Sequence, residues 1–285
     1  MKNIFIVGAT NQIGHFLLPM LKDSYNIFAL SRKKHEDTKI NWIQSDIKEL
    51  DESVIDSLNI NILIYIGSME YLSEFLNKFK NLNRVILFSS TSAITKRDSA
   101  VEDEKELSQT LFLGEESAKK WCNDNLVNLT ILRPTLIYGI NKDKNIAVIT
   151  NFITKFKFFP LIGNGKGLRM PVHAYDLANA TFKIIDNAKT YGKTYSLAGA
   201  ETLTYREMVG RIFLSLNQKV IIINIPEFLF KTLLNIVKIV PKYRYLSTGM
   251  VDRINQDLCF DIKEAKKDFE YSPLSFIPNE EISNV

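Results

Sequence analysis

The first fourteen residues constrain the fold of this chain more than any other stretch. An apolar, β-rich run over residues 3–7 ends at Gly8, and a short turn leads through Asn11 to Gly14, where a helical pattern is already under way. This order of strand, glycine turn and helix is the context that a dinucleotide-phosphate loop requires. The free N–H groups of the first helical turn would then face an anion.

Each glycine of this turn has a predicted role. Gly8 lets the chain turn sharply off the strand, and Gly14 lets the helix pack closely on the sheet. Asn11 replaces the middle glycine, and we expect it to keep the turn intact because Asn tolerates a left-handed backbone. Its side chain should narrow the approach to the phosphate. An ordinary turn without a ligand is the alternative. The predicted cofactor-binding residues here are Gly8, Thr10, Asn11, Gln12, Ile13 and Gly14.

Short apolar runs and helical patterns alternate through the first half of the chain. This alternation predicts an α/β fold, a Rossmann-type doubly wound parallel sheet covered on both faces. The predicted strands are 3–7, 27–30, 40–43, 62–66, 84–88 and 129–132, and the predicted helices are 12–22, 70–80 and 103–125.

Composition excludes several classes of protein. A hydrophobic fraction of 46% supplies a core, so disorder is not expected. The net charge is +4, and no basic run exceeds residues 32–34, which argues against nucleic-acid binding. Cys122 and Cys259 lack metal-ligand spacing, so we expect no metal site and a reducing, cytoplasmic location. Gly8 and Asn11 come too early for the apolar core of a secretory signal.

One apolar stretch, residues 220–240, is long enough to suggest a membrane, but six polar or proline residues interrupt it. No integral membrane segment is therefore expected. Within it, residues 226–240 show the spacing of a helix with one apolar face. We prefer core packing for this face, while contact with a membrane surface or a partner, including a second copy of the chain, stays open.

The end of the second predicted strand indicates which nucleotide is bound. An NAD site usually has a carboxylate there, whereas this chain has Ser31, Arg32, Lys33 and Lys34. Arg32 can hold a 2′-phosphate in a fork and Ser31 can donate to it, so NADP(H) is preferred and NAD(H) is possible. A solvated basic loop is the alternative. Asp46 can meet the adenine amino group, or can cap the following helix.

Five segments together resemble one family. Residues 8–14 match its phosphate turn, 45–47 its adenine contact and 88–91 its strand-end serine motif, while 132–139 and 169–178 match two longer signatures. On these segments the chain resembles the short-chain dehydrogenase/reductase superfamily, in its extended branch of nucleotide-sugar epimerases, dehydratases and reductases. The resemblance covers nearly the whole chain.

This resemblance implies that the chain has a cofactor-binding domain and a substrate-binding lobe. Residues 1–138 and 170–198 are expected to form the NAD(P)-binding domain, and 139–169 and 199–285 a smaller, mainly helical substrate lobe. The resemblance also implies further cofactor-binding residues, which are Ile47, Ile66, Gly67, Ser89, Ser90 and Pro134.

The family's proton-transfer pair is missing. The family has a Tyr followed four residues later by a Lys on the helix after the serine strand, where the lysine and the cofactor lower the tyrosine pKa. This chain has no tyrosine between Tyr71 and Tyr138. Either Glu115 or Glu116 matches the family's helix glutamate beyond the lost pair, which leaves Leu, Ser or Phe in its place.

Few side chains are candidates for catalysis in place of the missing pair. Thr91 stands in the place of the family's catalytic Ser/Thr, and Glu104, Glu115 and Glu116 are the nearest carboxylates in sequence. Carboxylates on such a helix are more often solvated surface.

The second half of the chain carries the substrate side of the resemblance. Arg169 follows a glycine-rich loop and matches an arginine that helps to bind the pyrophosphate of a nucleotide sugar, which suits a bidentate donor. An ordinary surface arginine is the alternative. We interpret His173 as a structural residue at the join between lobes, before a helix that starts at Asp176.

Two function classes remain. One is an NADP-dependent epimerase or keto-sugar reductase with a substituted proton donor. The other is a catalytically inactive dinucleotide-binding sensor or assembly protein, since fold alone does not decide function.

Overall fold

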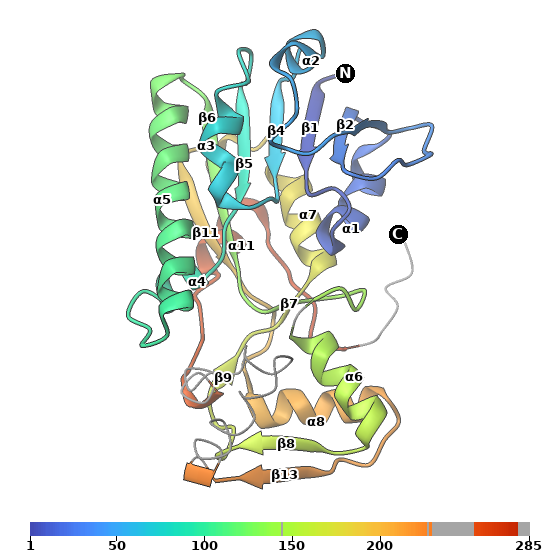
Figure 1. Ribbon diagram of the computed structural model, residues 1–285, viewed down its shortest axis with the longest axis vertical. Helices are drawn as coiled ribbons and strands as arrows, with labels where there is room; N and C mark the ends of the chain where they lie inside the picture. The colour runs from blue at the N-terminus through green and yellow to red at the C-terminus, as the bar shows by residue number, and fades with distance from the viewer. Residues whose placement is uncertain (144, 227, 230–253, 279–285) are drawn as a thin grey trace.

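A computed structural model describes residues 1–143, 145–226, 228–229 and 254–278. Among these residues, seven strands form one parallel sheet in the order β11-β6-β5-β4-β1-β2-β3. The predicted α/β fold is confirmed (Figure 1). The strands of this sheet are β1 (Asn3–Val7), β2 (Asn26–Ser31), β3 (Asn41–Gln44), β4 (Ile62–Tyr65), β5 (Arg84–Phe88), β6 (Asn128–Pro134) and β11 (Lys193–Leu197).

The two faces of the sheet bury different side chains of the same strands. In β1, Ile4 and Ile6 belong to one buried apolar cluster, whereas Phe5 and Val7 belong to another. Successive side chains of a strand point to opposite faces, so both faces of this sheet are covered. The central strands β4 and β5 are buried at every position, as continuous apolar runs in a parallel sheet predict.

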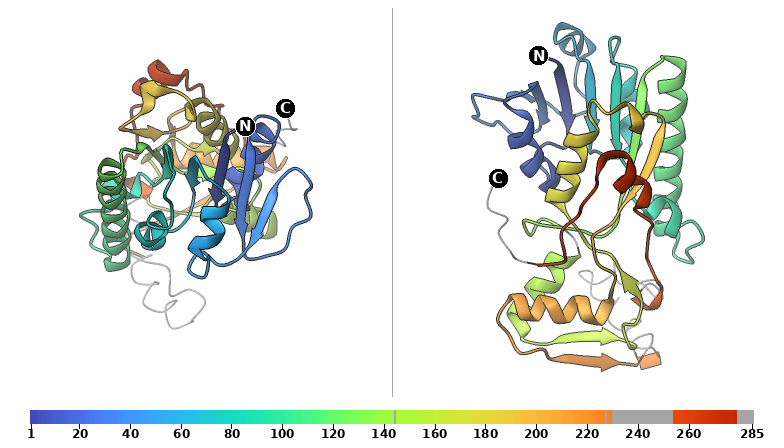
Figure 2. Two further views of the ribbon diagram at one scale, coloured as in Figure 1. Left: turned by 90° about the horizontal axis from the view of Figure 1, so that it is seen from above. Right: turned by 180° about the vertical axis from the view of Figure 1, so that it is seen from behind.

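Helices cover both faces (Figure 2). The helices α1 (Gln12–Leu21), α7 (Ala174–Ile184) and α11 (Lys263–Phe269) pack on the first face, where Leu17, Leu177 and Phe269 join the cluster. On the second face lie α3 (Leu72–Leu76) and α5 (Glu102–Asp124), which contribute Phe75 and Cys122. The remaining helical turns of this half are α2 (Glu52–Ser57), η1 (Met69–Tyr71), α4 (Ser92–Thr95) and η2 (Ala188–Thr190).

Strand order reverses at the centre of the sheet. β1 pairs with β2 on one side and with β4 on the other, in parallel register. In open α/β sheets, ligands bind outside the carboxyl ends of the strands at such a switch point. The glycine turn that follows β1 lies at this place.

A smaller part of the molecule lies beyond the carboxyl ends of the strands (Figure 1). It has a third buried cluster that includes Ile153, Ile212 and Phe276. Its elements are α6 (Ile146–Phe156), β8 (Phe159–Ile162), α8 (Tyr205–Ser215) and β13 (Ile222–Ile225), and β8 pairs with β13. Two short pairs join it to the sheet: β7 (Ile137–Tyr138) with β10 (Val172–His173), and β9 (Leu168–Arg169) with β12 (Leu203–Thr204).

The expected division into two domains stays a prediction. Residues 262–271 were assigned to the substrate lobe, but Ile262, Ala265, Phe269 and Tyr271 pack in the cluster on the first face of the sheet. Residues 262–271 therefore contribute to the core of the larger part, whereas Phe276 packs in the third cluster.

The helices predicted over 12–22 and 103–125 are each within one residue of the observed bounds, whereas two other helix boundaries differ by more than one residue. The helix expected over 70–80 ends at Leu76, because the N–H groups of Lys78 and Phe79 bond three residues back and break the α-helical pattern. The helix expected to start at Asp176 starts at Ala174, because the His173 side chain caps it. The helix expected over 226–240 lies almost wholly outside the described residues. Within the described ranges, no helix has the length and apolarity needed to cross a membrane.

Candidate functional site

The turn after β1 needs glycine at both ends. Gly8 has a φ of 83°, and a Cβ placed there would lie 2.4 Å from the Ile66 carbonyl oxygen. A Cβ at Gly14 would lie 2.1 Å from the carbonyl oxygen of Ala9. Real Cβ atoms do not approach backbone this closely, so no larger residue fits either position without moving the chain.

Asn11 does not use the left-handed backbone that we expected. Its φ of −78° and ψ of 178° are extended, and it is the N-cap of α1. The Asn11 side-chain oxygen accepts hydrogen bonds from the N–H groups of Ile13, at 2.8 Å, and Gly14, at 2.9 Å. This is the usual N-cap geometry, in which the backbone is not helical and the side-chain oxygen accepts from N–H groups of the first helical turn.

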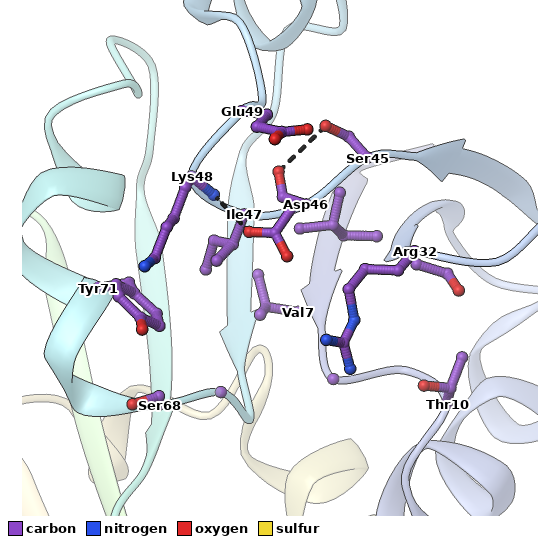
Figure 3. A pocket seen from close by; sticks show the side chains of 14 residues that line it. Val7, Thr10, Arg32, Ser45, Asp46, Ile47, Lys48, Glu49, Ser68 and Tyr71 are labelled. Atoms are coloured by element: carbon purple, nitrogen blue, oxygen red, sulfur yellow. Dashed lines mark hydrogen bonds between the residues drawn. The ribbon is translucent and has the colours of Figure 1, made fainter.

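A first cavity of about 530 Å³ lies beside this turn, between β2 and β4 (Figure 3). Seven of the predicted cofactor residues line it, namely Gly8, Thr10, Ser31, Arg32, Asp46, Ile47 and Gly67. The Arg32 side chain extends along one side of the cavity toward the Thr10 end, and Asp46 lies across from it. The structure thus brings together residues that lie up to 59 positions apart in the chain.

Lys48 and Tyr71 also line the first cavity, and sequence reasoning missed both. The Lys48 ammonium lies 4.4 Å from the centre of the Tyr71 ring, the geometry of a cation–π contact. The sequence signal was their position after the third and fourth strands. The Ser31 hydroxyl is partly engaged already, because it bonds the ring of His35 at 2.9 Å and accepts from the Lys33 N–H.

A second cavity of about 670 Å³ lies between the sheet and the smaller part of the molecule. Gln12, Ser90, Thr91 and Arg169 line it among the predicted site residues. Three cationic side chains and one carboxylate face this cavity among the described residues, namely Lys96, Lys142, Arg169 and Asp143. Lys96 is paired with the Glu104 carboxylate at 3.8 Å, which leaves Lys142 and Arg169 against Asp143. A net positive charge in a cleft favours an anionic ligand.

Six predicted cofactor residues line neither cavity in the described structure: Asn11, Ile13, Gly14, Ile66, Ser89 and Pro134. The Pro134 carbonyl oxygen accepts from the Thr91 N–H at 3.1 Å and from the Thr91 hydroxyl at 3.2 Å. Pro134 therefore holds Thr91 in place. The assignment of Thr91 as catalytic stays a prediction.

Glu115 and Glu116 occupy opposite environments although they are neighbours. The Glu115 side chain is fully buried and forms a bidentate pair with the Arg133 guanidinium, with 2.9 Å from Nε to Oε1, and accepts from the Ser89 hydroxyl. The expectation of a solvated carboxylate was wrong for Glu115, because this face of α5 packs on the sheet. Glu116 is exposed and pairs with Lys119 at 2.7 Å.

The Glu104 carboxylate already has a hydrogen-bond donor and a cationic partner. Its carboxylate accepts from the Ser99 hydroxyl at 2.8 Å and lies 3.8 Å from the Lys96 ammonium. Of the three carboxylates that we considered for proton transfer, Glu104, Glu115 and Glu116, none lines either cavity as the structure describes them.

Arg169 is buried at the rim of the second cavity rather than on the surface, so the alternative of an ordinary surface arginine was wrong. Its guanidinium donates to the carbonyl oxygens of Leu168 and Gln256, both at 2.7 Å, and lies 5.7 Å from the centre of the Tyr205 ring. Burial lowers the pKa of Arg169 and raises the pKa of Tyr205 to about 12. Tyr205 also lines the cavity, and nothing in the sequence singled it out.

His173 fits the structural interpretation. Its Nδ1 accepts from the N–H of Tyr175 at 3.0 Å, which caps α7. Burial lowers the pKa of His173 to about 4, so the ring is neutral at pH 7. In the described part of the chain, no group of three or more His, Cys, Asp or Glu side chains is arranged to hold a metal ion.

Comparison with known proteins agrees with this architecture. The model of the NAD dependent epimerase/dehydratase family matches residues 56–198. The chain is 19% identical to the UDP-glucose 4-epimerase of Vibrio cholerae, over 95% of this chain and 91% of that protein. The structure of a Bacillus cereus UDP-glucuronic acid 4-epimerase, in complex with UDP-glucuronic acid and NAD, superposes with a TM-score of 0.75 at 15% identity, and covers 97% of this chain and 95% of that one.

A second kind of relative is also similar. The chain is 24% identical, over 74% of its length, to a Dictyostelium discoideum protein named NADH dehydrogenase [ubiquinone] 1 alpha subcomplex subunit 9, mitochondrial. It spans only about half of that relative, 52% of its length. The region matched by the family model contains the sheet strands β4, β5, β6 and β11 and the helices between them. The chain belongs to the NAD dependent epimerase/dehydratase family.

Proposed function

We propose that this protein binds NAD(P)(H) and a nucleotide sugar, and that it acts slowly on that sugar as an epimerase or keto-sugar reductase. One observation carries the proposal. Two cavities lie on either side of the glycine turn, at the edge of the sheet where ligands of such folds bind. Gly8 and Thr10 line the first cavity, and Gln12 lines the second.

The first cavity fits the adenosine half of the cofactor. A Cβ at Gly8 would lie 2.4 Å from the Ile66 carbonyl oxygen, so the turn beside this cavity keeps its shape only with glycine. Asp46, Ile47 and Arg32 line this cavity. In the proposal Asp46 and Ile47 contact the adenine and Arg32 contacts the ribose end. Preference for NADP(H) over NAD(H) is part of the proposal, and it rests on Arg32.

The second cavity fits the nicotinamide end and an anionic substrate. The excess of cations around it suits the pyrophosphate of a nucleotide sugar. The epimerases to which the chain is similar carry sugar nucleotides in their names, which supports the same substrate class here.

Bound nicotinamide would supply hydride transfer in this cavity. Proton transfer falls to the protein, and the Thr91 hydroxyl already donates to the Pro134 carbonyl oxygen. A threonine hydroxyl is too weak an acid to act alone at neutral pH. Because Glu115 is held by Arg133 and Glu116 lies on the surface, we expect turnover well below that of an enzyme with a placed acid.

The first prediction concerns Thr91. Thr91→Val should abolish the activity measured with NADPH and a panel of keto-sugar nucleotides, followed by the absorbance of the reduced nicotinamide. The affinity for NADPH should change little, because the substitution removes one hydroxyl, which donates to the Pro134 carbonyl oxygen, and leaves the lining of the first cavity intact. Thr150→Val is the matched control, since the Thr150 hydroxyl is buried in α6 with no hydrogen-bond partner among the described atoms. Full activity of Thr91→Val would place the active site elsewhere.

The second prediction concerns Arg169. Arg169→Ala should weaken binding of UDP or dTDP by about 10- to 100-fold, the value of a charge-assisted hydrogen bond, and leave NADPH binding nearly intact. The Leu168 and Gln256 carbonyl oxygens lose a donor at the same time, so Arg169→Lys is tested beside it. Arg206→Ala serves as control, because Arg206 lies in the same lobe outside the cavity lining. Loss of cofactor binding alone would contradict the assignment.

A second candidate function is a dinucleotide-binding sensor or assembly protein without turnover. The occupied carboxylates favour it, as does similarity to a relative named as a subunit of NADH dehydrogenase. NADPH binding with undetectable turnover across the substrate panel would support this function over the first. A cytoplasmic location, and a homodimeric or membrane-peripheral state, stay predictions.

A further inference from the structure

The side chain of Asn11 occupies the hydrogen-bond donors at the start of α1. Its Oδ1 lies 2.8 Å from the Ile13 nitrogen and 2.9 Å from the Gly14 nitrogen, within the range of full N–H···O bonds. The first N–H groups of a helix have no partner inside the helix, and they are the donors that an anion at a helix N-terminus uses. In this chain two of them are already satisfied.

Asn11 also lies between the two cavities. Gly8 and Thr10 line the first cavity, Gln12 lines the second, and no described residue lines both. A ligand with one half in each cavity has to cross the turn at Asn11. The Asn11 amide nitrogen faces the other end of the turn, since a Cβ at Gly8 would lie 3.1 Å from it. Figure 3 shows the Arg32 and Thr10 side chains on the same side of the first cavity.

We propose that Asn11 is an internal competitor for the pyrophosphate of the cofactor and so lowers the affinity of this protein for dinucleotides. This inference rests on the proposed function. The Asn11 oxygen takes the place of a phosphate oxygen on the Ile13 and Gly14 N–H groups. A pyrophosphate reaches these donors only by displacing it, so part of the binding free energy is spent on breaking the cap. A nucleotide that fills only the first cavity and has no 5′-phosphate avoids this cost.

The test compares two ligands and two variants by calorimetric titration. NADPH carries the pyrophosphate, whereas 2′-AMP carries the adenosine and the 2′-phosphate without it. Asn11→Gly removes the competing oxygen, and Gly is itself tolerated at a helix N-cap, so the fold should be retained. Asn11→Asp keeps the cap and adds a negative charge beside the crossing pyrophosphate.

Asn11→Gly should raise the affinity for NADPH by about 5- to 100-fold, the effect of releasing two hydrogen bonds, and leave the affinity for 2′-AMP unchanged. Asn11→Asp should lower the affinity for NADPH without changing that for 2′-AMP. An NADPH affinity that is unchanged or lower in Asn11→Gly would overturn the inference, because it would mean that the amide is neutral or helps to hold the phosphate. If neither the parent nor the variants bind NADPH or 2′-AMP, the proposed function itself fails.

Discussion

Replacing Glu115 by Gln is expected to lower the free energy of unfolding by about 3 kcal/mol, because removing one partner of a buried ion pair leaves the other charge uncompensated. The Glu115 side chain is 0% exposed, and that of Arg133 is 18% exposed. Both Glu115 oxygens accept from the guanidinium, and Oε1 also accepts from Ser89. A glutamine of the same size has one oxygen and an amide that points a donor at the guanidinium. The loss is therefore electrostatic rather than steric.

Urea unfolding followed by circular dichroism measures this change. Glu116→Gln is the matched control, since the same substitution one residue along α5 breaks only an exposed pair with Lys119. Exposed pairs contribute about 0–1 kcal/mol, so the control should stay close to the parent. Equal effects of the two substitutions would show that the Glu115 pair does not hold α5 on the sheet.

This prediction bears on the candidate active site. Ser89 follows β5 and Arg133 lies in β6, so Glu115 ties α5 to two strand ends. The Thr91 N–H bonds the carbonyl oxygen of Pro134, the residue after Arg133. Loss of activity in Glu115→Gln would thus be expected from displacement of Thr91 alone. Unfolding has to be measured before any loss is read as evidence for proton transfer by Glu115.

Replacing Arg32 by Ala is expected to weaken NADPH binding by about 1.5–3 kcal/mol, or roughly 10- to 100-fold, because a hydrogen bond to a charged group is lost. Arg32 lines the first cavity beside Ser31 and Thr10, where the 2′-phosphate of the proposed cofactor would lie. NADH lacks that phosphate, so its affinity should change little. Calorimetric titration of both cofactors with the parent and the variant separates the two effects.

Lys34→Ala controls for general charge in this loop. The Lys34 side chain is 77% exposed, pairs weakly with Glu36 at 3.5 Å and does not line the cavity. It should change the affinity for NADPH much less than Arg32→Ala does. If the parent binds NADH and NADPH equally, and Arg32→Ala alters neither, the predicted preference for NADP(H) is wrong.

Local sequence patterns were sufficient for the architecture of the larger part. The apolar runs predicted the strands of the sheet from β1 to β6, with shifts of one or two residues at their ends. Gly8 and Gly14 were predicted to be needed for the shape of the first turn, and in the structure a Cβ at either position would collide with a backbone carbonyl oxygen. The strands depend on short apolar runs, which the sequence shows directly. The Gly8 clash involves Ile66, which is distant in sequence, so the need for glycine there is explained only by the fold.

The environment of each polar side chain was decided by tertiary structure. Glu115 and Glu116 are adjacent and identical in type, yet one is buried against Arg133 and the other is in solvent, because α5 packs on the sheet by one face only. Arg169 meets Gln256, and Lys48 meets Tyr71, across long separations in sequence that no local pattern records.

The hydrogen bonds of Asn11 could not be predicted from the sequence either, although its partners are only two and three residues away. The sequence placed it correctly in the turn, but its backbone angles and the direction of its side chain follow from the start of α1, which offers two N–H groups within reach. A residue's type and position determine which hydrogen bonds it can make. Which of them it does make depends on the donors and acceptors that folding brings to it, and only the folded chain has those in place.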